Sequence, residues 1–540
     1  MGIMDKNQIM RPLLWRGVLL FAGVALLLMA DFALAAGTTG TVVWAILSVA
    51  DVAAFAALLL ADFRARRDER VLASLTMLLA LAFVLGEYGC STDSSLSFLV
   101  SIWKVLAVLL FLAVLAMDAR AGFAGARRLA ASKKSLCVIG LMAVMAVAMV
   151  LQMAFSSALS SKGIVRSLTF YGGVALVVYA AVSLLSSRCR IDVFRAVLRA
   201  ALACSLVFAF VEMFTDFHLP TCWLYSDDPN VVAQLQEVER SYENWRWVTA
   251  TGIFFNPNNF CLFLAALAVF SLPARYESPA MRRFSLSLAC IALLVCSMLG
   301  ATIVSTALLV GLALWLAFSP GKWRGRLLVG LVAVLCYFLL PDLCMRTIMA
   351  IVGCDTGAVT SVANDFAVQA EGFEQESGSM FSRVVIYRDM VQLVVSHPLG
   401  IGPAGIHAYF LSNPSVSYLV DPHSWPLEFA ACYGWVPFVL YASLCVWFAA
   451  SAFRARKADD TGLSPMVFSG FVVCCLGSFA PSSSDFNALL WLPVLLCAAL
   501  SANRELLDAP ACEVGEGGML SDAPHGARQD GSGSEGRDAK

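Results

Sequence analysis

Long apolar runs recur along almost the whole of this 540-residue chain, and they leave few options for its fold. The first, VLLFAGVALLLMADFALAA, begins just after Arg16 and is long enough to cross a hydrocarbon core, which takes about 20 residues. The chain is 60% hydrophobic and 14% charged, whereas globular domains are about 45–50% apolar and about 25% charged. The sequence therefore predicts an all-α polytopic membrane protein.

The apolar runs predict about 14 transmembrane helices, with roughly 12 to 14 as the range. After the first, they lie near residues 41–61, 71–89, 97–117, 136–156, 168–187, 196–214, 251–272, 284–300, 302–318, 327–341, 425–449, 466–481 and 487–502. Most of the 17 cysteines lie inside these runs, where cysteine behaves as a small hydrophobe, and they show no metal-ligand spacing. Cys344 and Cys354 lie outside the runs and could form a disulfide or remain free thiols.

Lys and Arg residues gather in alternate intervals between the runs, and this bias orients the helices. The basic intervals contain Arg64, Arg66, Arg67 and Arg70; Arg127, Arg128, Lys133 and Lys134; Arg188, Arg190 and Arg195; Arg282 and Arg283; Lys322, Arg324 and Arg326; and Arg454, Arg456 and Lys457. The pattern predicts a multi-pass protein of the cell membrane with both termini in the cytoplasm. A cleaved signal peptide ending near Ala35 is the alternative, and its removal would force the next helix to re-orient the bundle.

These boundaries divide the chain into parts of different character. The predicted parts are a cytoplasmic N-terminus at 1–16, a transmembrane bundle at 17–340 with an acidic, aromatic outer loop at about 216–251, a large and partly helical extracytoplasmic loop at 341–424, C-terminal transmembrane helices at 425–502, and a disordered cytoplasmic tail at 503–540. Residues suited to chemistry concentrate in one turn-rich stretch, 381–435, which contains Arg383, Arg388, His397, His407 and His423.

The segment from Ser382 to Ser396 has the pattern of an amphipathic helix, stopped by the prolines and glycines of HPLGIGPAG. Arg383 and Tyr387 share one face of that helix, whereas Arg388 points about 140° away from Arg383 at 100° per residue. Arg383 is therefore the better candidate ligand for an anion. The alternative is an arginine that lies at the level of the lipid headgroups.

The segment GIFFNPNNF places Asn256 and Pro257 where a helix would re-enter the membrane from outside. These residues satisfy the usual start signals of a helix, so a well-capped helix is the simpler interpretation. The exposed N–H groups of that helix start, with Asn258 beside them and Arg246 ten residues upstream, would also suit an anion.

His423 lies in DPHSWPLE, between Asp421 and Glu428, directly before an apolar run. Trp425 suits the interfacial belt of a membrane, which would hold the imidazole at the outer surface. There it could remove a proton from a sugar hydroxyl. The alternative is an ordinary hydrogen-bonded loop histidine.

Four ionisable residues lie inside the apolar runs, and such residues at membrane depth are functional candidates by default. They are Lys104, Glu212, Asp31 and Asp51. Lys104 could pair with a carboxylate or extend to the outer interface. Their roles cannot be assigned from the sequence.

The chain resembles the O-antigen ligase and polymerase family of membrane glycosyltransferases. The resemblance rests on NPNN at 256–259, SRVVIYRDM with HPLGIGPAGIHAYF within 382–410, and HSWPLE at 423–428, in this order around a large outer loop. It covers roughly the second half of the chain. One departure is GATIVSTALL near residue 300, which lacks the Ser-Arg pair that many members have there.

The resemblance implies a GT-C-like fold and an inverting, metal-independent transfer of glycan from a polyprenyl diphosphate carrier such as undecaprenyl diphosphate, to a glycan or lipid acceptor, at the outer membrane face. His423 would be the base. Arg383, Arg246 and Arg388 would bind the diphosphate, supported by Asn256, Asn258, Tyr387 and Glu428. No cofactor, metal or nucleic acid is implied, and membrane lipids are the surroundings.

Two other classes of function remain open. A flippase or transporter of lipid-linked glycans could have a similar number of spans, but it predicts charged residues and broken helices near the bilayer midplane. Here the polar residues gather in the outer loops, which favours the enzyme. An envelope scaffold with a degenerate site is the third option. Ligase and polymerase cannot be separated, because both break the same bond to the carrier and differ in the acceptor.

Overall fold

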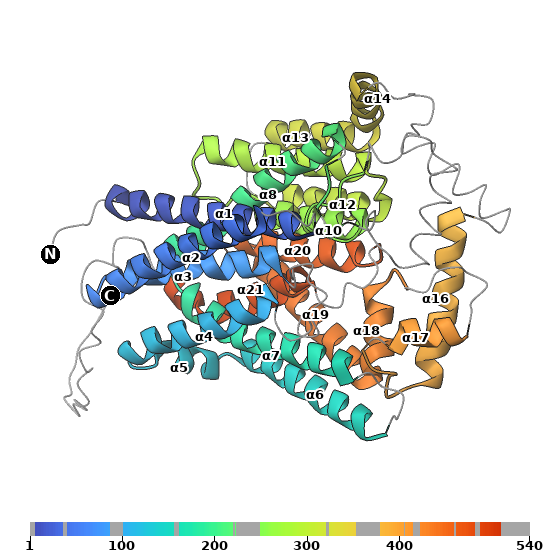
Figure 1. Ribbon diagram of the computed structural model, residues 1–540, viewed down its shortest axis with the longest axis horizontal. Helices are drawn as coiled ribbons and strands as arrows, with labels where there is room; N and C mark the ends of the chain where they lie inside the picture. The colour runs from blue at the N-terminus through green and yellow to red at the C-terminus, as the bar shows by residue number, and fades with distance from the viewer. Residues whose placement is uncertain are drawn as a thin grey trace, which may run out of the picture.

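The computed structural model describes residues 6–35, 40–86, 101–155, 161–215, 217–219, 222, 249–319, 323–352, 378–403, 405–413, 422–457, 459, 461–480 and 487–508. All regular elements among these residues are helical (Figure 1). In chain order they are α1 (Lys6–Ala35), α2 (Gly40–Arg64), α3 (Asp68–Leu85), α4 (Ile102–Arg120), α5 (Ala124–Ala131), α6 (Lys133–Phe155), α7 (Ser161–Leu184), α8 (Arg188–Thr215), α10 (Pro257–Phe270), α11 (Pro279–Met298), α12 (Thr302–Phe318), α13 (Trp323–Phe338), α14 (Leu340–Val352), α16 (Gly378–Ser396), α17 (Gly405–Ser412), α18 (Trp425–Tyr433), α19 (Trp435–Ala455), α20 (Leu463–Gly477), the 3₁₀ helix η5 (Ala488–Trp491), α21 (Leu492–Ala502) and α22 (Arg504–Asp508).

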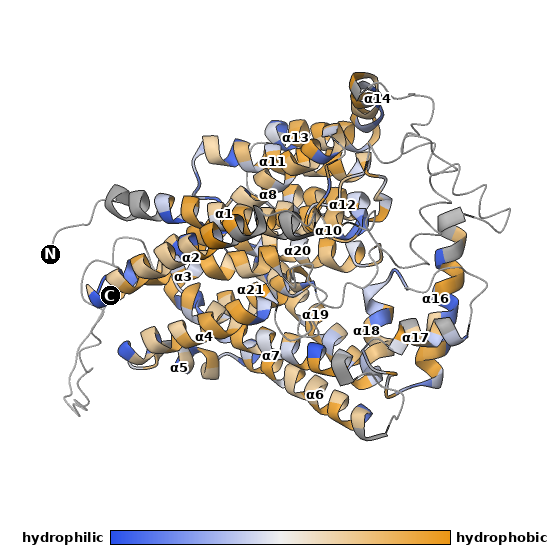
Figure 2. Ribbon diagram, viewed as in Figure 1, coloured by the Kyte–Doolittle hydropathy of each residue, from blue (hydrophilic) through white to orange (hydrophobic). Residues whose placement is uncertain are grey.

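Among the described helices, seven are long and apolar enough to cross a membrane, or eight if the bent pair α13 and α14 forms one span. Five more apolar helices have 10–17 residues: Leu14–Ala30, Pro257–Phe270, Thr302–Phe318, Leu463–Gly477 and Ala488–Ala502. Apolar residues run along the length of the helices in the bundle, and hydrophilic residues gather toward their ends (Figure 2). These features are those of a multi-pass helical membrane protein. The larger number of 12 to 14 spans and the GT-C-like architecture stay predictions.

The bundle has two distinct ends. Helix α1 begins at one end, where α5 also lies, and α16 stands across the other end with α17 and α18 beside it (Figure 1). Ile386, Met390 and Leu393 of α16 are buried, and α16 packs on α18. The helix that the sequence predicted from Ser382 to Ser396 is therefore confirmed, with its start a turn earlier at Gly378.

The apolar run at 425–449 is not one helix, as the sequence predicted, but two. Helix α18 ends at Tyr433 and α19 begins at Trp435, because Gly434 has φ +84°, which interrupts the helix and favours glycine. The N–H of Trp435 donates to the carbonyl of Pro398 at 2.9 Å. The break thus gives a place to dock to the turn formed by residues 398–402, called here the PLGIG turn.

The PLGIG turn pairs with the end of α18 through its backbone. The N–H groups of Ile401 and Gly402 donate to the carbonyls of Ala431 and Cys432 at 2.8 and 3.0 Å. Gly400 has φ +79°, and a Cβ atom there would lie 2.6 Å from the carbonyl oxygen of Cys432. The glycines of this motif therefore serve a close backbone contact that any side chain would obstruct.

Several charged side chains are buried in contact with one another at the end of the bundle opposite α16. Arg195 and Arg199 both contact one carboxylate oxygen of Glu277, at 2.7 and 2.5 Å, and all three side chains are at most 8% exposed. Arg199 also donates to the carbonyl of Ser271 at 3.2 Å. Arg16 of α1 pairs with Asp62 of α2, again out of solvent. Each of these arginines has a carboxylate partner within the fold.

The ionisable residues that the sequence placed inside spans take different positions. Lys104 is buried in the first turn of α4, and Asp51 lies against α1, where a Cβ atom on Gly23 would lie 2.5 Å from its carboxylate. Glu212 is fully buried near the end of α8. The side chain of Asp31 and the whole of Cys354 lie outside what the structure describes.

Candidate active site

Helix α16 presents Arg383 and Tyr387 on the face turned toward the chain before α18. The Tyr387 hydroxyl is within hydrogen-bond distance of two carbonyls, that of His423 at 2.8 Å and that of Phe479 at 2.9 Å. Burial raises the pKa of this phenol, while the charge of Arg383 opposes the rise. Tyr387 therefore stays a hydrogen-bond donor that ties α16 to His423, in the segment before α18.

Arg388 lies on another side of α16. Its guanidinium is exposed and contacts Asp389 Oδ1 at 3.1 Å. Arg383 is half-buried and makes no ion pair with a carboxylate in the described part of the chain. The predicted division of faces agrees with this geometry: Arg383 points to the same place as Tyr387, and Arg388 is neutralised by its neighbour.

His423 has an uncommon backbone conformation. Its φ is +47°, in the left-handed region that non-glycine residues rarely adopt, and the Tyr387 hydroxyl holds its carbonyl. The ring nitrogen Nδ1 is buried, and no residue that the structure describes forms a hydrogen bond with it. A buried ring nitrogen without a partner is costly, so this imidazole is available to a group that the described residues do not supply.

The surroundings of His423 keep its ring neutral. The pKa of His423 is lowered to about 4, first by burial and then by the positive charge of Arg383, while a backbone hydrogen bond with Ala480 acts in the opposite direction. The imidazole is therefore an unprotonated acceptor at neutral pH. A bound anion near Arg383 would offset that charge and raise the basicity of the ring.

Trp425 does not have the interfacial position that the sequence suggested. It is 3% exposed and packs against Phe429, Tyr441 and Trp491, with ring centroids 5.4, 4.8 and 6.3 Å away. The backbone N–H of Trp425 donates a hydrogen bond to the carbonyl of Ser478 at 2.9 Å. The tryptophan fixes His423 through the protein core rather than through lipid, because α18 begins inside the bundle. Glu428 is buried in the first turn of α18.

Asn256 caps α10 as the sequence predicted. Its side chain accepts a hydrogen bond from the N–H of Asn259 at 2.9 Å, and Pro257 occupies the first helical position. Asn258 is half-buried in the same turn. Arg246 and Asp421 lie outside the described residues, so the predicted meeting of Arg246 with this helix start stays a prediction.

A buried histidine that the sequence analysis missed stands behind this helix start. His218 Nδ1 contacts Glu212 at 3.0 Å, and both side chains are at most 1% exposed. Glu212 also accepts hydrogen bonds from the N–H groups of Thr251 and Gly252, at 3.2 and 2.8 Å. Glu212 therefore anchors the chain that leads into NPNN. The signal was a polar pair only six residues apart around the end of an apolar run.

A mostly apolar groove of about 810 Å³ lies at the same end of the bundle. Its lining comes from α6, the PLGIG turn, α17 and the break between α18 and α19, with His397 and Tyr409 among the residues that border it. Gln152 of α6 closes its inner wall by donating to the carbonyls of Leu399 and Cys432, at 2.6 and 2.8 Å. The side chain of His407 is not described.

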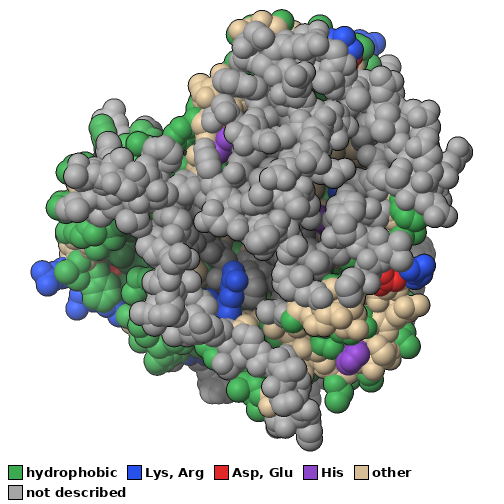
Figure 3. Space-filling view, turned by 45° about the vertical axis from the view of Figure 1, so that its right-hand side comes forward, with side chains coloured by type: hydrophobic (Ala, Val, Ile, Leu, Met, Phe, Trp, Pro, Cys, Tyr) green, Lys and Arg blue, Asp and Glu red, His purple; other side chains and the backbone are tan. Residues whose placement is uncertain are grey.

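This end of the molecule displays cationic and histidine side chains between apolar and polar surface (Figure 3). Among the described residues, no group of three or more His, Cys, Asp or Glu side chains could hold a metal ion. The described chemistry consists of a guanidinium, a phenol and a neutral imidazole. These groups can bind an anion and accept a proton.

The helical fold and this site define a multi-pass membrane protein with a polar site at one end of its bundle. In the comparison with protein families, residues 284–442 match the model of the O-antigen ligase family. The matched segment contains α12, the site residues of α16 and His423, and this confirms the resemblance stated from the motifs. No curated protein matches the chain.

Proposed function

We propose that this protein transfers a glycan from a polyprenyl diphosphate carrier to an acceptor hydroxyl at the outer face of the cytoplasmic membrane. The observation that carries the proposal is the neutral His423 ring, whose buried Nδ1 has no partner among the described residues, within the electrostatic reach of Arg383. A proton acceptor beside an anion ligand is what a glycosyl transfer from a diphosphate requires.

In the proposed step, the acceptor oxygen forms a bond to the anomeric carbon while the bond from that carbon to the diphosphate oxygen breaks. The proton of the acceptor hydroxyl passes to His423, and the electron pair of the broken bond leaves with the diphosphate. Arg383 stabilises the charge that develops on this leaving group. Attack opposite to the leaving group inverts the configuration of the sugar.

The low pKa of His423 fits this sequence of events. With the site empty, the buried ring near Arg383 is a weak base. The negative charge of the donor would neutralise Arg383 and raise the pKa of the imidazole toward the operating pH, where a general base is most effective. The donor would thus activate the base that it needs.

The lipid of the carrier needs an apolar site near the reacting end. The groove of about 810 Å³ beside the PLGIG turn has the size and the lining for part of a prenyl chain. Exposed apolar side chains of α6, including Val147 and Leu151, line it from the membrane side. We therefore assign the carrier chain to this groove and the diphosphate to Arg383.

The test is a reconstituted assay with the purified protein in liposomes, a polyprenyl diphosphate-linked oligosaccharide and a candidate acceptor. We expect transfer that continues in EDTA, detected by mass spectrometry of the product, and inversion of the anomeric configuration, detected by NMR spectroscopy of the product. Movement of the intact donor across the bilayer without transfer to any acceptor would contradict the proposal and support the transporter. Loss of transfer in EDTA would contradict the metal-free step.

A further inference from the structure

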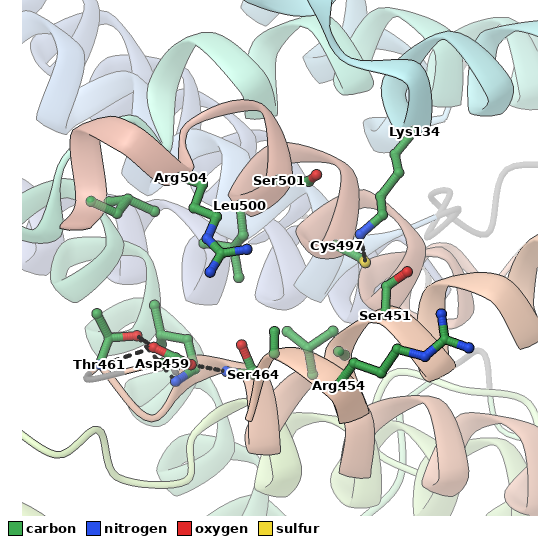
Figure 4. Close-up of a pocket in the computed structure, with 15 residues that line it drawn as sticks. Lys134, Ser451, Arg454, Asp459, Thr461, Ser464, Cys497, Leu500, Ser501 and Arg504 are labelled. Atoms are coloured by element: carbon green, nitrogen blue, oxygen red, sulfur yellow. Dashed lines mark hydrogen bonds between the residues drawn. The ribbon is translucent and has the colours of Figure 1, made fainter. Parts of the chain in front are cut away.

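A second cavity lies at the end of the bundle opposite α16. Its volume is about 460 Å³, and it is bordered by α6, α19, α20, α21 and α22 (Figure 4). Lys134, Arg454 and Arg504 supply three cationic side chains from three different helices. None of these residues belongs to the candidate active site.

The carboxylate in this cavity is occupied. Asp459 accepts hydrogen bonds from the N–H and hydroxyl of Thr461, at 2.8 and 2.5 Å, and from the N–H of Ser464 at 2.5 Å (Figure 4). It therefore serves to cap the start of α20. Among the described lining residues, Lys134, Arg454 and Arg504 stand against this one carboxylate, which already has three donors, so their formal charges sum to a positive value.

Lys134 is held over the cavity by weak contacts. Its Nζ lies 3.7 Å from Cys497 Sγ and 5.6 Å from the centre of the Phe448 ring. In the described part of the chain, neither Lys134 nor Arg454 forms an ion pair with a carboxylate. Lys134 also lies in the first turn of α6, where the helix dipole disfavours a cation. A bound anion would remove that penalty.

The rest of the lining indicates which anion fits. Ala452, Leu463, Val467 and Leu500 give the cavity apolar walls below the cations. A free phosphate ion would leave these walls exposed and would fill little of the volume. An amphiphile whose charged group meets the cations and whose apolar part covers the walls uses both features.

We propose that this cavity binds the phosphodiester headgroup of an anionic phospholipid of the inner leaflet. The positive-inside pattern predicts this end of the bundle to be cytoplasmic, and basic pockets between helices on that side suit anionic headgroups. Lys134 and Arg454 contact the phosphate from two sides, and Arg504 closes the third. The site does not depend on the proposed glycosyl transfer.

The test is native mass spectrometry of the full-length protein, with titration of phosphatidylglycerol, phosphatidylcholine of the same acyl chains, and inorganic phosphate. We expect retention of phosphatidylglycerol and not of phosphatidylcholine. The double variant Lys134→Gln and Arg454→Gln should weaken phosphatidylglycerol binding by about tenfold or more. The matched control, Arg127→Gln and Lys457→Gln, removes two exposed cations outside the cavity and should bind within about twofold of the unaltered protein.

Equal weakening in the control would show general surface attraction and overturn the site. Displacement of phosphatidylglycerol by millimolar inorganic phosphate would mean that a free phosphate is the ligand, and would overturn the lipid assignment. Thermal unfolding of both double variants without added lipid checks that they are folded. The proposal is supported if the cavity double variant and the control double variant unfold at the same temperature and the cavity variant binds less phosphatidylglycerol.

Discussion

Arginines at the two ends of the bundle are handled in opposite ways. Arg195 and Arg199 converge on one carboxylate, that of Glu277, out of solvent. Arg383 is half-buried beside a neutral histidine and has no carboxylate partner within the described residues. The first arrangement is closed and holds the fold together, whereas the second is open and awaits an anion. The presence of a partner, rather than burial, separates the structural arginines from the functional candidate.

The largest effect should come from the end of the bundle that holds Arg383 and His423. We expect His423→Ala to lower the transfer rate by about 10²–10⁴-fold, since that is the usual contribution of a positioned general base. Binding of the donor should remain, because Arg383 is unchanged. The measurement is single-turnover transfer with donor binding followed separately. Transfer within a few-fold of the unaltered protein would exclude His423 as the base.

A substitution in the cluster of Glu277, Arg195 and Arg199 should lower the stability of the protein instead. Glu277→Ala leaves Arg195 and Arg199 as uncompensated buried cations, so the free energy of unfolding should fall by about 3–5 kcal/mol. Asp342→Ala is the matched control, because Asp342 pairs with the half-exposed Arg346 at 3.4 Å, and exposed pairs contribute about 1 kcal/mol or less. Thermal unfolding in detergent gives both values. Equal losses would mean that the Glu277 cluster is not a buried pair.

The two arginines of α16 sharpen the contrast within one helix. Arg383→Lys keeps the charge but loses the planar fork that can hold two phosphate oxygens, so transfer should fall by about tenfold or more. Arg388→Lys should change transfer by less than about threefold, because Arg388 is exposed and paired with Asp389. Rates for both variants with the same lipid-linked donor make the comparison. Equal losses would contradict the assignment of faces.

The smallest effect concerns pH. Because the pKa of His423 is lowered to about 4, the free site is active above that pH, and kcat/KM should decline only as the pH falls through about 4. The decline of kcat should occur at higher pH, since the bound donor offsets Arg383 and raises the pKa. Arg383→Gln removes one of the causes that lower the pKa of His423, so the decline of kcat/KM should then begin at a higher pH. An unchanged pH dependence of kcat/KM in this variant would show that Arg383 has no influence on the pKa of His423.

Local sequence rules predicted the elements whose signals are short in range. The face shared by Arg383 and Tyr387, the end of α16 at Ser396 and the cap at Asn256 follow from spacing, proline and glycine, and the structure has them. The same rules failed at Gly434, where a glycine inside an apolar run breaks the helix because the PLGIG turn docks there. That contact joins residues far apart in the sequence, so no local pattern announces it.

Contacts across long separations also explain the other misses. Trp425 looked like an interfacial residue, yet the rings around it come from α18, α19 and η5 and place it in the core. His218 was overlooked because its importance arises from burial with Glu212 and from the backbone at Thr251 and Gly252. Which polar groups become buried together is decided by packing, which a hydropathy pattern does not contain.

The short helix α18 links two places that the substrate would occupy. It has nine residues and a length of about 13 Å, with His423 just before its start and the wall of the apolar groove at Tyr433. Hydrogen bonds clamp both ends, from Trp425 to Ser478 and from Gln152 to Cys432. A helix anchored at both ends keeps the imidazole and the groove at a fixed separation. A substrate that uses both places therefore has to span the length of α18, which sets the distance between its reacting end and its apolar part.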